Sequence, residues 1–415
     1  MRSYSDLFRT REFTPLFLSS ALHSTASTIG GLAIGTLVYK ATESPLLSAV
    51  SMFGPQLAQV VGATTLLSAA DRLPPRSTMT GIALSFALGT AAMAIPGLPL
   101  WTLFALIAVL GLISSLGGGV RWGLLNEILS KDGYLLGRSV FNMVNGFTQI
   151  AGFATGGVLV AVLSPRATLG IAAVLYLAAA LVTRLGLSQR APRAAGRPSI
   201  AQTWRTNAVL WSSPPRRRTY LLLWIPNGLI VGCESLFVSY APDRAGLLFA
   251  CGAFGMFVGD VLTGRFIPPS VRRRLGIPFL LLLATPYLIF ALRPGTAIAA
   301  ACIALASVGF GASLIQQEHL MALTPDELSG HALGLHSSGM LTMQGVSAAL
   351  AGAVAQLTSA GTAMTAMAAA SIAVTVTLSA AGKCAERRSG GRGDGEGGAV
   401  AEVLGSPQNT RTTGA

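Results

Sequence analysis

One acidic residue, Glu234, lies inside a long apolar run, in the segment LIVGCESLF. Tyr220, Trp224, Asn227, Val231 and Glu234 follow one another at alternating spacings of four and three, so they share one face of a helix. A carboxyl group that is shielded from water can bind and release a proton as its hydration changes. Glu234 is therefore a candidate for proton coupling, and the alternative is a structural side chain that hydrogen-bonds to a neighbouring helix.

His23 is a second ionisable side chain within an apolar run, and Ser20 and Ser27 lie on the same helix face. It follows the expected start of its segment, residue 13, by about 15 Å of helix, which places it near the middle of a bilayer. Histidine titrates near neutral pH, so His23 could relay protons or donate a hydrogen bond to a substrate. A neutral histidine that only packs against other helices is the alternative.

A polar stripe marks the segment around residue 149, where Asn142, Asn145, Gln149, Gly152 and Gly156 alternate at spacings of three and four. Its amides could bind a substrate or a facing helix, and its glycines favour close helix packing. Further side chains that could line the same cavity are Gln56, Gln59, Asn227, Met340, Met343 and Gln344. Methionine adapts to varied apolar ligands, although core packing is the alternative for each methionine.

A group of charged residues should lie at one common depth, at the ends of the apolar segments. This candidate cytoplasmic gate comprises Asp71, Arg72, Arg76, Arg121, Asp260, Arg265 and Glu318. An acid beside an arginine and a helix N-terminus is stabilised while it is shielded from water, and it loses that advantage when water enters. A solvated surface cluster is the alternative.

The elements that must position these side chains are membrane helices. The chain of 415 residues is 52% hydrophobic and 11% charged, whereas a soluble domain carries about a quarter charged residues. Spanning a bilayer takes about 20 apolar residues as a helix. Runs of that kind predict twelve spans, at 13–39, 46–70, 77–96, 99–121, 138–163, 167–187, 219–241, 245–267, 275–292, 296–320, 332–357 and 362–382. The composition argues against a soluble enzyme.

The orientation follows from the basic residues, which cytoplasmic loops retain. With the N-terminus inside, 25 of the 29 Lys and Arg residues fall in cytoplasmic segments, and only Lys40, Arg166, Arg244 and Arg293 fall outside. We therefore expect a multi-pass protein of the inner (cytoplasmic) membrane with both termini in the cytoplasm. The same distribution accounts for the net charge of +13 without a nucleic-acid partner.

The chain divides into two similar parts. ADRLPPR, which begins at Ala70, corresponds to GRFIPPSVRRR, which begins at Gly264, and GLISSLGGGVRWGLL aligns with GFGASLIQQEHLMAL at an offset of 198 residues. A duplicated unit of six helices explains both matches. We expect an N-terminal six-helix bundle over 1–187, a basic cytoplasmic linker over 188–218, a C-terminal six-helix bundle over 219–382 and a disordered cytoplasmic tail over 383–415.

The twelve-helix plan resembles the major facilitator superfamily, over essentially all of residues 7–382. The family's loop motif G-x-x-x-D-R-x-G-R-[RK] is matched by Asp71, Arg72 and Arg76, while Leu67 and Pro74 replace its two glycines and Pro75 replaces the arginine after the second glycine. The segment GFATGG from Gly152 is similar to the antiporter motif G-P-x-x-G-G, with Phe153 in place of proline. The resemblance implies an all-α membrane protein of two pseudo-symmetric bundles and an inner gate in which Asp71 pairs with Arg121. The chain looks most like actinobacterial macrolide and drug efflux members.

These features together predict a secondary transporter that exports small apolar or amphipathic molecules, such as a drug or secondary metabolite, in exchange for protons. Uptake or uniport of a small metabolite would instead call for a cavity dense in charged or hydroxyl groups, and a non-transporting receptor or scaffold would need no ionisable residue facing a cavity. The sequence has no G-x-x-x-x-G-K-[ST] motif and no C-x-x-C spacing, so we expect no ATP-driven step, metal or cofactor. We expect a monomer whose partners are the lipid bilayer, protons and the substrate.

The orientation can be tested by labelling single cysteines in a background without the four native cysteines. Cysteines placed at Ser199 and Ser389 should react with a membrane-impermeant maleimide only in broken cells, because both lie in basic cytoplasmic segments. A cysteine at Thr42 should react in intact cells. Labelling of the Ser199→Cys variant in intact cells would rule out the expected orientation.

Overall fold

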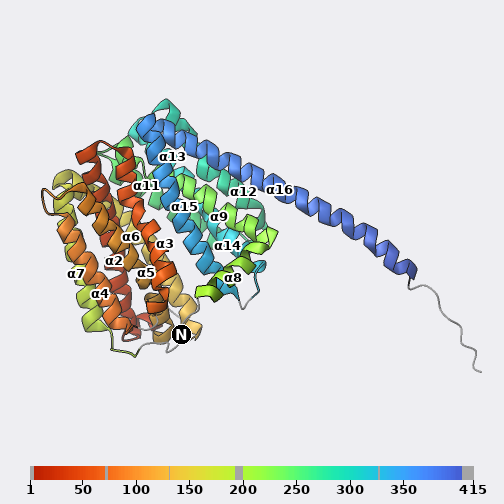
Figure 1. Cartoon of the computed structure of the whole chain (residues 1–415), viewed down its shortest axis with the longest axis horizontal. Helices are drawn as coiled ribbons and strands as arrows, with labels where there is room; N and C mark the ends of the chain where they lie inside the picture. Colours follow the sequence, from red (N-terminus) through yellow and green to blue (C-terminus); the bar gives the residue numbers. More distant parts are fainter. Residues whose placement is uncertain (1–3, 71–72, 130, 192–199, 326–327, 404–415) are drawn as a thin grey trace, which may run out of the picture.

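The computed structural model describes the chain apart from residues 1–3, 71–72, 130, 192–199, 326–327 and 404–415. The described part is helical between short connections and contains no strand (Figure 1). Nine helical segments within it are long and apolar enough to cross a membrane. The expected all-α integral membrane fold is therefore confirmed.

The N-terminal half of the chain forms long helices that pack side by side (red to yellow in Figure 1). They are α1 (Tyr4–Arg9), α2 (Phe13–Thr42), α3 (Pro45–Ala70), α4 (Pro75–Met93), α5 (Leu100–Ile128), α6 (Lys131–Val162) and α7 (Pro165–Gly186). Proline in the first turn sets the start of α4 and α7, because its missing N–H is not needed there. Ser164 caps α7 by accepting a hydrogen bond from the backbone N–H of Ala167 at 3.1 Å.

The C-terminal half is more interrupted (green to blue in Figure 1). It comprises α8 (Ile200–Ser212), α9 (Pro214–Glu234), α10 (Phe237–Tyr240), α11 (Ala245–Val261), η1 (Leu262–Phe266), α12 (Pro269–Ala284), η2 (Thr285–Leu292), α13 (Thr296–Val308), η3 (Gly309–Gly311), α14 (Ala312–Ala322), α15 (Ser329–Leu357) and α16 (Ala360–Val403). The change from α12 to the 3₁₀ segment η2 falls at Pro286, which cannot donate the next α-helical hydrogen bond.

A helix overlaps each predicted span within the described residues, but that all twelve cross the membrane stays a prediction. The expected end of the fourth span at residue 121 is wrong, because α5 continues to Ile128. A charged residue does not end a membrane helix when it faces a cavity instead of lipid.

The linker also differs from a plain loop. Residues 200–212 form α8, and α9 begins at Pro214 instead of residue 219. The stretch 200–212 contains neither proline nor glycine, so nothing in it breaks a helix. Trp211 stacks on Trp224 of α9, with ring centroids 5.6 Å apart, and this contact holds α8 against α9.

The end of the chain is partly beyond what the structure describes. The backbone of α16 is helical to Val403, past the expected end of the last span at 382. Side chains after Gly382 and all of residues 404–415 lie outside the described residues. The expected disorder of 383–415 therefore stays a prediction.

The two halves touch through a few helices, chiefly α3 against α15 and α6 against α11. A Cβ atom at Gly157 of α6 would lie 2.7 Å from the Cα atom of Gly246, in the first turn of α11. Beside this contact Phe153 stacks on Phe249, with ring centroids 4.6 Å apart. Gly157 and Gly246 both lie at the helix ends opposite the N-terminus of α2. In the expected orientation this end faces outward, so the outer side is closed.

The contact between Gly157 and Gly246 predicts that Gly157→Leu separates α6 from α11. The leucine would meet backbone atoms of Gly246, which cannot move aside as the end of a flexible side chain would. The outer side should then open, and a cysteine at Ile34 should label several-fold faster with impermeant maleimide in intact cells. Gly81→Leu is the matched control, since a Cβ atom there meets nothing within 4 Å. Equal labelling of the two variants would mean that this contact does not hold the outer side closed.

Candidate functional site

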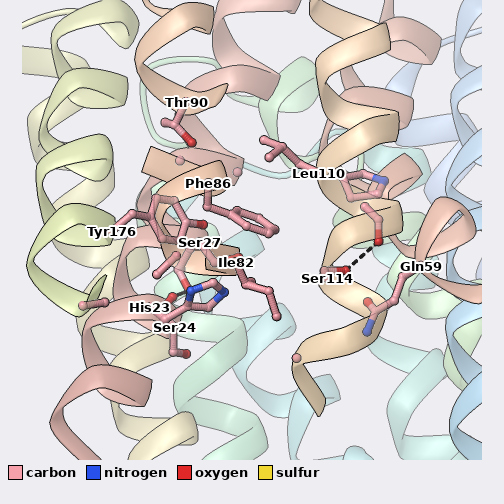
Figure 2. A pocket seen from close by; sticks show the side chains of 18 of the residues that line it. His23, Ser24, Ser27, Gln59, Ile82, Phe86, Thr90, Leu110, Ser114 and Tyr176 are labelled. Atoms are coloured by element: carbon pink, nitrogen blue, oxygen red, sulfur yellow. Dashed lines mark hydrogen bonds between the residues drawn. The ribbon is translucent and has the colours of Figure 1, made fainter. Parts of the chain in front are cut away.

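A cavity of about 530 Å³ lies among the N-terminal helices (Figure 2). Its walls come from α2, α3, α4, α5, α6 and α7, and Leu341 of α15 closes it from the other half of the chain. Its polar lining residues are Ser19, Ser20, His23, Ser24, Ser27, Thr28, Ser51, Gln56, Gln59, Thr90, Ser114, Arg121, Gln149, Tyr176 and Thr183. The cavity is large enough for a small organic molecule.

His23 projects into this cavity from α2 together with Ser24 and Ser27 (Figure 2). Its ring meets Phe86 of α4 and Tyr176 of α7 edge-on, with centroids 5.1 and 4.9 Å away. Phe86 and Tyr176 also lie against each other, with centroids 5.2 Å apart, so the three rings form one cluster that restricts the imidazole. The structure therefore places His23 at this cavity, held by aromatic rings from two other helices.

The cavity changes in polarity along its length. On α2 the lining residues pass from Ser20 and His23 to Ile34, and on α5, which runs the opposite way, they pass from Ile107 to Arg121. Along these two antiparallel helices, hydroxyl, imidazole and guanidinium groups thus lie toward one end and aliphatic side chains toward the other, where Ser51 of α3 and Thr90 of α4 also contribute hydroxyl groups. A molecule with one polar and one apolar end would match both.

Arg121 lies at the polar end, about 10 Å before the end of α5 at Ile128. Its guanidinium carbon lies 5.1 Å from the ring centroid of Trp122, and its charge acts on His23. The Nε atom is buried and has no hydrogen-bond partner in the described part of the chain. Arg121 also lines a second, smaller cavity of about 110 Å³ together with Ser20 and Ser24.

The predicted cavity residues separate into two groups. Gln56, Gln59 and Gln149 line the cavity. In contrast, the Nε2 atom of Gln344 donates to Oδ1 of Asn227 at 3.1 Å, so these two amides satisfy each other between α15 and α9.

The remaining candidates do not contribute to the described lining. Met343 packs against Gly228 of α9, since a Cβ atom added at Gly228 would lie 2.9 Å from the backbone of Met343. Met340 lies partly buried on the same helix, α15. The side chains of Asn142 and Asn145 lie outside the described residues.

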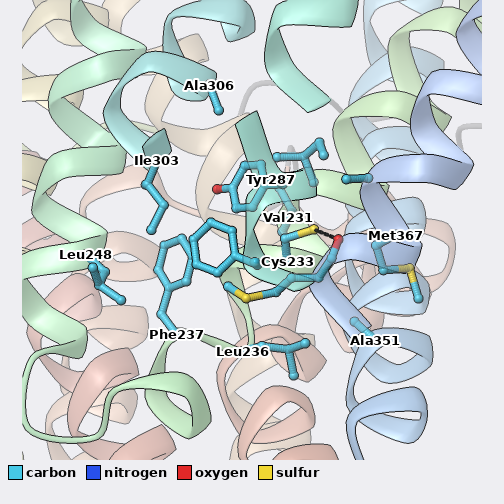
Figure 3. Close-up of a cluster of buried hydrophobic side chains, with 14 of the residues drawn as sticks. Val231, Cys233, Leu236, Phe237, Leu248, Tyr287, Ile303, Ala306, Ala351 and Met367 are labelled. Atoms are coloured by element: carbon cyan, nitrogen blue, oxygen red, sulfur yellow. Dashed lines mark hydrogen bonds between the residues drawn. The ribbon is translucent and has the colours of Figure 1, made fainter. Parts of the chain in front are cut away.

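Glu234 lies in the other half of the chain, at the last position of α9. It is 8% exposed, and its chain neighbours Cys233 and Leu236 belong to the apolar cluster that contains Phe237 and Tyr287 (Figure 3). Its Oε1 atom and the Tyr287 hydroxyl have no hydrogen-bond partner among the described residues, although the two side chains are close enough to interact electrostatically. Glu234 is thus a buried, incompletely paired acid that does not belong to the described cavity lining.

The expected gate residues are only partly described. Asp71 and Arg72 lie outside the described residues, so their pairing with Arg121 stays a prediction. Arg76 donates a hydrogen bond to the backbone carbonyl of Arg184. Asp260 and Arg265 are exposed on α11 and η1.

Three ion pairs among the described residues at this end join different segments of the chain. Glu318, a predicted gate residue of α14, pairs with Arg272 at 3.4 Å. Arg190, which follows α7, pairs with Glu12 at 2.8 Å and with Glu127 at 3.6 Å. The two pairs of Arg190 tie together the start of α2 and the ends of α5 and α7.

Several lining residues escaped the sequence reasoning, namely Phe86, Ser114, Tyr176 and Thr183. Aromatic and hydroxyl side chains are common in membrane helices, so nothing distinguishes those that face a cavity from those that pack. Arg121 carried a usable signal, because GLISSLGGGVRWGLL continues apolar beyond the arginine. An arginine inside a span, not at its end, is a candidate for a functional site.

A sequence profile of the Major Facilitator Superfamily matches residues 16–317. No curated protein sequence matches the chain. Among solved structures, a peptide transporter POT in complex with sulfate has a TM-score of 0.70 and 14% identity, covering 89% of this chain and 94% of that one. A bacterial homolog of the human lysosomal transporter Spinster, in an inward-facing and unoccupied conformation, has a TM-score of 0.67 and 12% identity, covering 88% and 95%. At these identities the likeness concerns the fold.

Proposed function

The chain belongs to the Major Facilitator Superfamily and is a secondary transporter of the membrane, and we propose that it exports small amphipathic molecules in exchange for protons. The observation that carries this proposal is the cavity among α2 to α7, in which the basic groups lie toward one end and the aliphatic residues of α2 and α5 lie toward the other. An amphipathic molecule can satisfy both ends, whereas a purely apolar molecule would leave the buried Nε atom of Arg121 and the hydroxyl of Ser20 without partners among the described residues.

Transport by this fold requires that the cavity open to each side in turn. The contact of Gly157 with Gly246 closes one side, and its glycines form a flat surface that can separate and meet again. We take the N-terminal helices α2–α7 and the C-terminal helices α9–α16 as the two bundles that rock against each other. In the expected orientation, the outward-closed structure is the form that loads an exported substrate from inside.

Proton coupling rests on two ionisable side chains at membrane depth, His23 in the cavity and Glu234 in the C-terminal half. A buried acid with an unpaired oxygen is costly in a packed helix unless it serves a purpose. Glu234 therefore supports transport over a scaffold role, for which full pairing or contact with lipid would be expected. We propose Glu234 as the proton site and His23 as a cavity residue.

Uptake of a polar metabolite is the second candidate. The cavity holds more hydroxyl groups than export of a purely apolar compound requires, with Ser19, Ser20, Ser24, Ser27 and Ser114 among its lining residues. A dense hydroxyl lining is what uptake of a hydrogen-bonding metabolite would need. The direction of net movement in proteoliposomes with an imposed proton gradient distinguishes the two candidates.

The cavity assignment predicts the effect of filling it. Gly31 lines the cavity and a Cβ atom there meets nothing within 4 Å, so Gly31→Leu should fold normally while occupying substrate space. Accumulation in proteoliposomes across a panel of amphipathic compounds should fall at least about tenfold, which corresponds to about 1.4 kcal/mol.

Gly170→Leu provides the matched control, because its Cβ atom also meets nothing within 4 Å but the residue does not line the cavity. It should transport like the parent protein. Equal activity of the two variants would place the substrate elsewhere. Accumulation that persists in the parent protein after addition of an uncoupler would exclude coupling to protons.

Glu234→Gln should abolish proton-driven accumulation while substrate binding and passive exchange remain measurable, because glutamine mimics the protonated acid and cannot release a proton. Accumulation and exchange are compared in the same proteoliposomes. Glu43→Gln, at an exposed acid between α2 and α3, is the control and should retain both. If Glu234→Gln accumulates substrate at the parental rate under every condition in which the parent protein is active, Glu234 is structural.

A further inference from the structure

The described lining of the cavity contains a fixed positive charge and no acidic residue. Among its described lining residues, Arg121 carries the one permanent charge, and no aspartate or glutamate is present. We propose that Arg121 binds the acidic head of the transported molecule, so that the substrates are amphipathic organic anions. This inference rests on the proposed transport function and specifies the chemical class of the substrate.

The first argument is the free-energy cost of the unpaired Nε atom of Arg121. An arginine within a membrane helix is stable only when it is paired or hydrated. The Nε atom of Arg121 is buried and has no partner among the described residues. A carboxylate in the cavity would supply two oxygen acceptors, which the planar guanidinium binds in a fork.

The second argument is the position of the guanidinium. The indole of Trp122 lies 5.1 Å below it and restricts its movement. The main cavity and the smaller cavity converge on it and share Ser20 and Ser24. The hydroxyl of Ser20 is buried without a hydrogen-bond partner in the described part of the chain, so it can donate to the same anion.

The third argument is the rest of the cavity. From Arg121 the lining of α5 passes through Gly117 and Ser114 to Leu110 and Ile107. An anion bound at Arg121 would therefore extend its apolar part toward the aliphatic end, next to Ile34. A strongly polar anion such as inorganic phosphate would leave that end unfilled.

Asp71 offers a competing partner for Arg121. If Asp71 neutralises Arg121 in the gate, the cavity carries no net charge and no preference for acids. An acid preference that is absent in the parent protein and appears only in Asp71→Asn would therefore overturn the proposal.

The test measures binding to the purified full-length protein in nanodiscs of phosphatidylcholine, which has no net charge. The probes form two matched trios, one built on naphthalene and one on a linear alkyl chain. Each trio consists of a carboxylate, the corresponding neutral carboxamide and the corresponding cationic amine. Titration calorimetry gives the affinity, and the Gly31→Leu protein gives the background from partition into the bilayer. The carboxylate should bind the parent at least about tenfold more tightly than the carboxamide, as a charge-assisted hydrogen bond predicts.

Arg121→Gln should lose this margin but bind the carboxamide as before, and Arg121→Lys should retain part of the margin because it keeps the charge without the fork. Arg166→Gln, at an exposed arginine outside the cavity, should behave like the parent. If the parent protein binds the carboxamide or the amine as tightly as the carboxylate, the anion site is refuted while the amphipathic cavity stands. The same holds if Arg121→Gln keeps the parental ratio of carboxylate to carboxamide affinity.

The parental comparison requires no substitution, so it decides the question even if an Arg121 variant fails to fold. Specific binding of none of the three probes would contradict the proposed amphipathic cavity itself and the anion site with it. The two proposals therefore fail in different ways.

Discussion

Close approach of helix backbones is the constraint on which the remaining structure depends. In lipid the hydrophobic effect does not drive one apolar helix against another, so helices associate through van der Waals contact at small residues. Helix α6 uses this device on two faces. Gly152 and Gly156 meet Thr28 and Ile29 of α2, which forms a wall of the cavity, while Gly157 meets Gly246 of α11 in the other half. One short glycine-rich stretch thus holds the cavity wall on one side and the contact between halves on the other.

The polar lining is tolerated because it faces a cavity and not lipid. A buried hydroxyl or guanidinium costs free energy unless water, a neighbour or a ligand satisfies it. Several hydroxyls return a hydrogen bond to their own helix, as Ser114 does to the carbonyl of Gly111 at 2.8 Å. Ser20 and Arg121 retain unpaired atoms within the described residues. Gln56 likewise lines the cavity and has a buried oxygen without a partner among the described residues. These unsatisfied groups distinguish the cavity from a polar helix interface such as that of Asn227 with Gln344, where the two amides satisfy each other.

The helical spans could be predicted from the sequence because the thickness of the bilayer sets the length of each apolar run. What the pattern could not supply was the direction in which each side chain points. Gln56 and Gln59 face the cavity, whereas Gln344, of the same chemistry and on a helix also assigned to the cavity, bonds to Asn227. Arg121 was misplaced at a helix end because charge usually marks a boundary, and only the tertiary arrangement of α2, α4 and α5 shows the cavity that makes a charge inside the span tolerable. The helix α8 was missed because a surface helix in a basic linker has no long apolar run.

The separation of Glu234 from the cavity constrains how a proton there could act on the substrate. Glu234 is the last residue of α9, and α9 packs tightly on α15. A Cβ atom added at Gly232 of α9 would lie 2.8 Å from the carbonyl oxygen of Ser347 on α15. On its other side α15 packs on α3, with Gly345 against Leu57, and α3 carries Gln56 and Gln59 into the cavity. Such tight contacts transmit displacement, because neither backbone can yield without moving the other. Protonation at Glu234 would therefore reach the substrate by shifting α15 against α3, and coupling would operate through the contact between halves and not through a proton passed to the substrate.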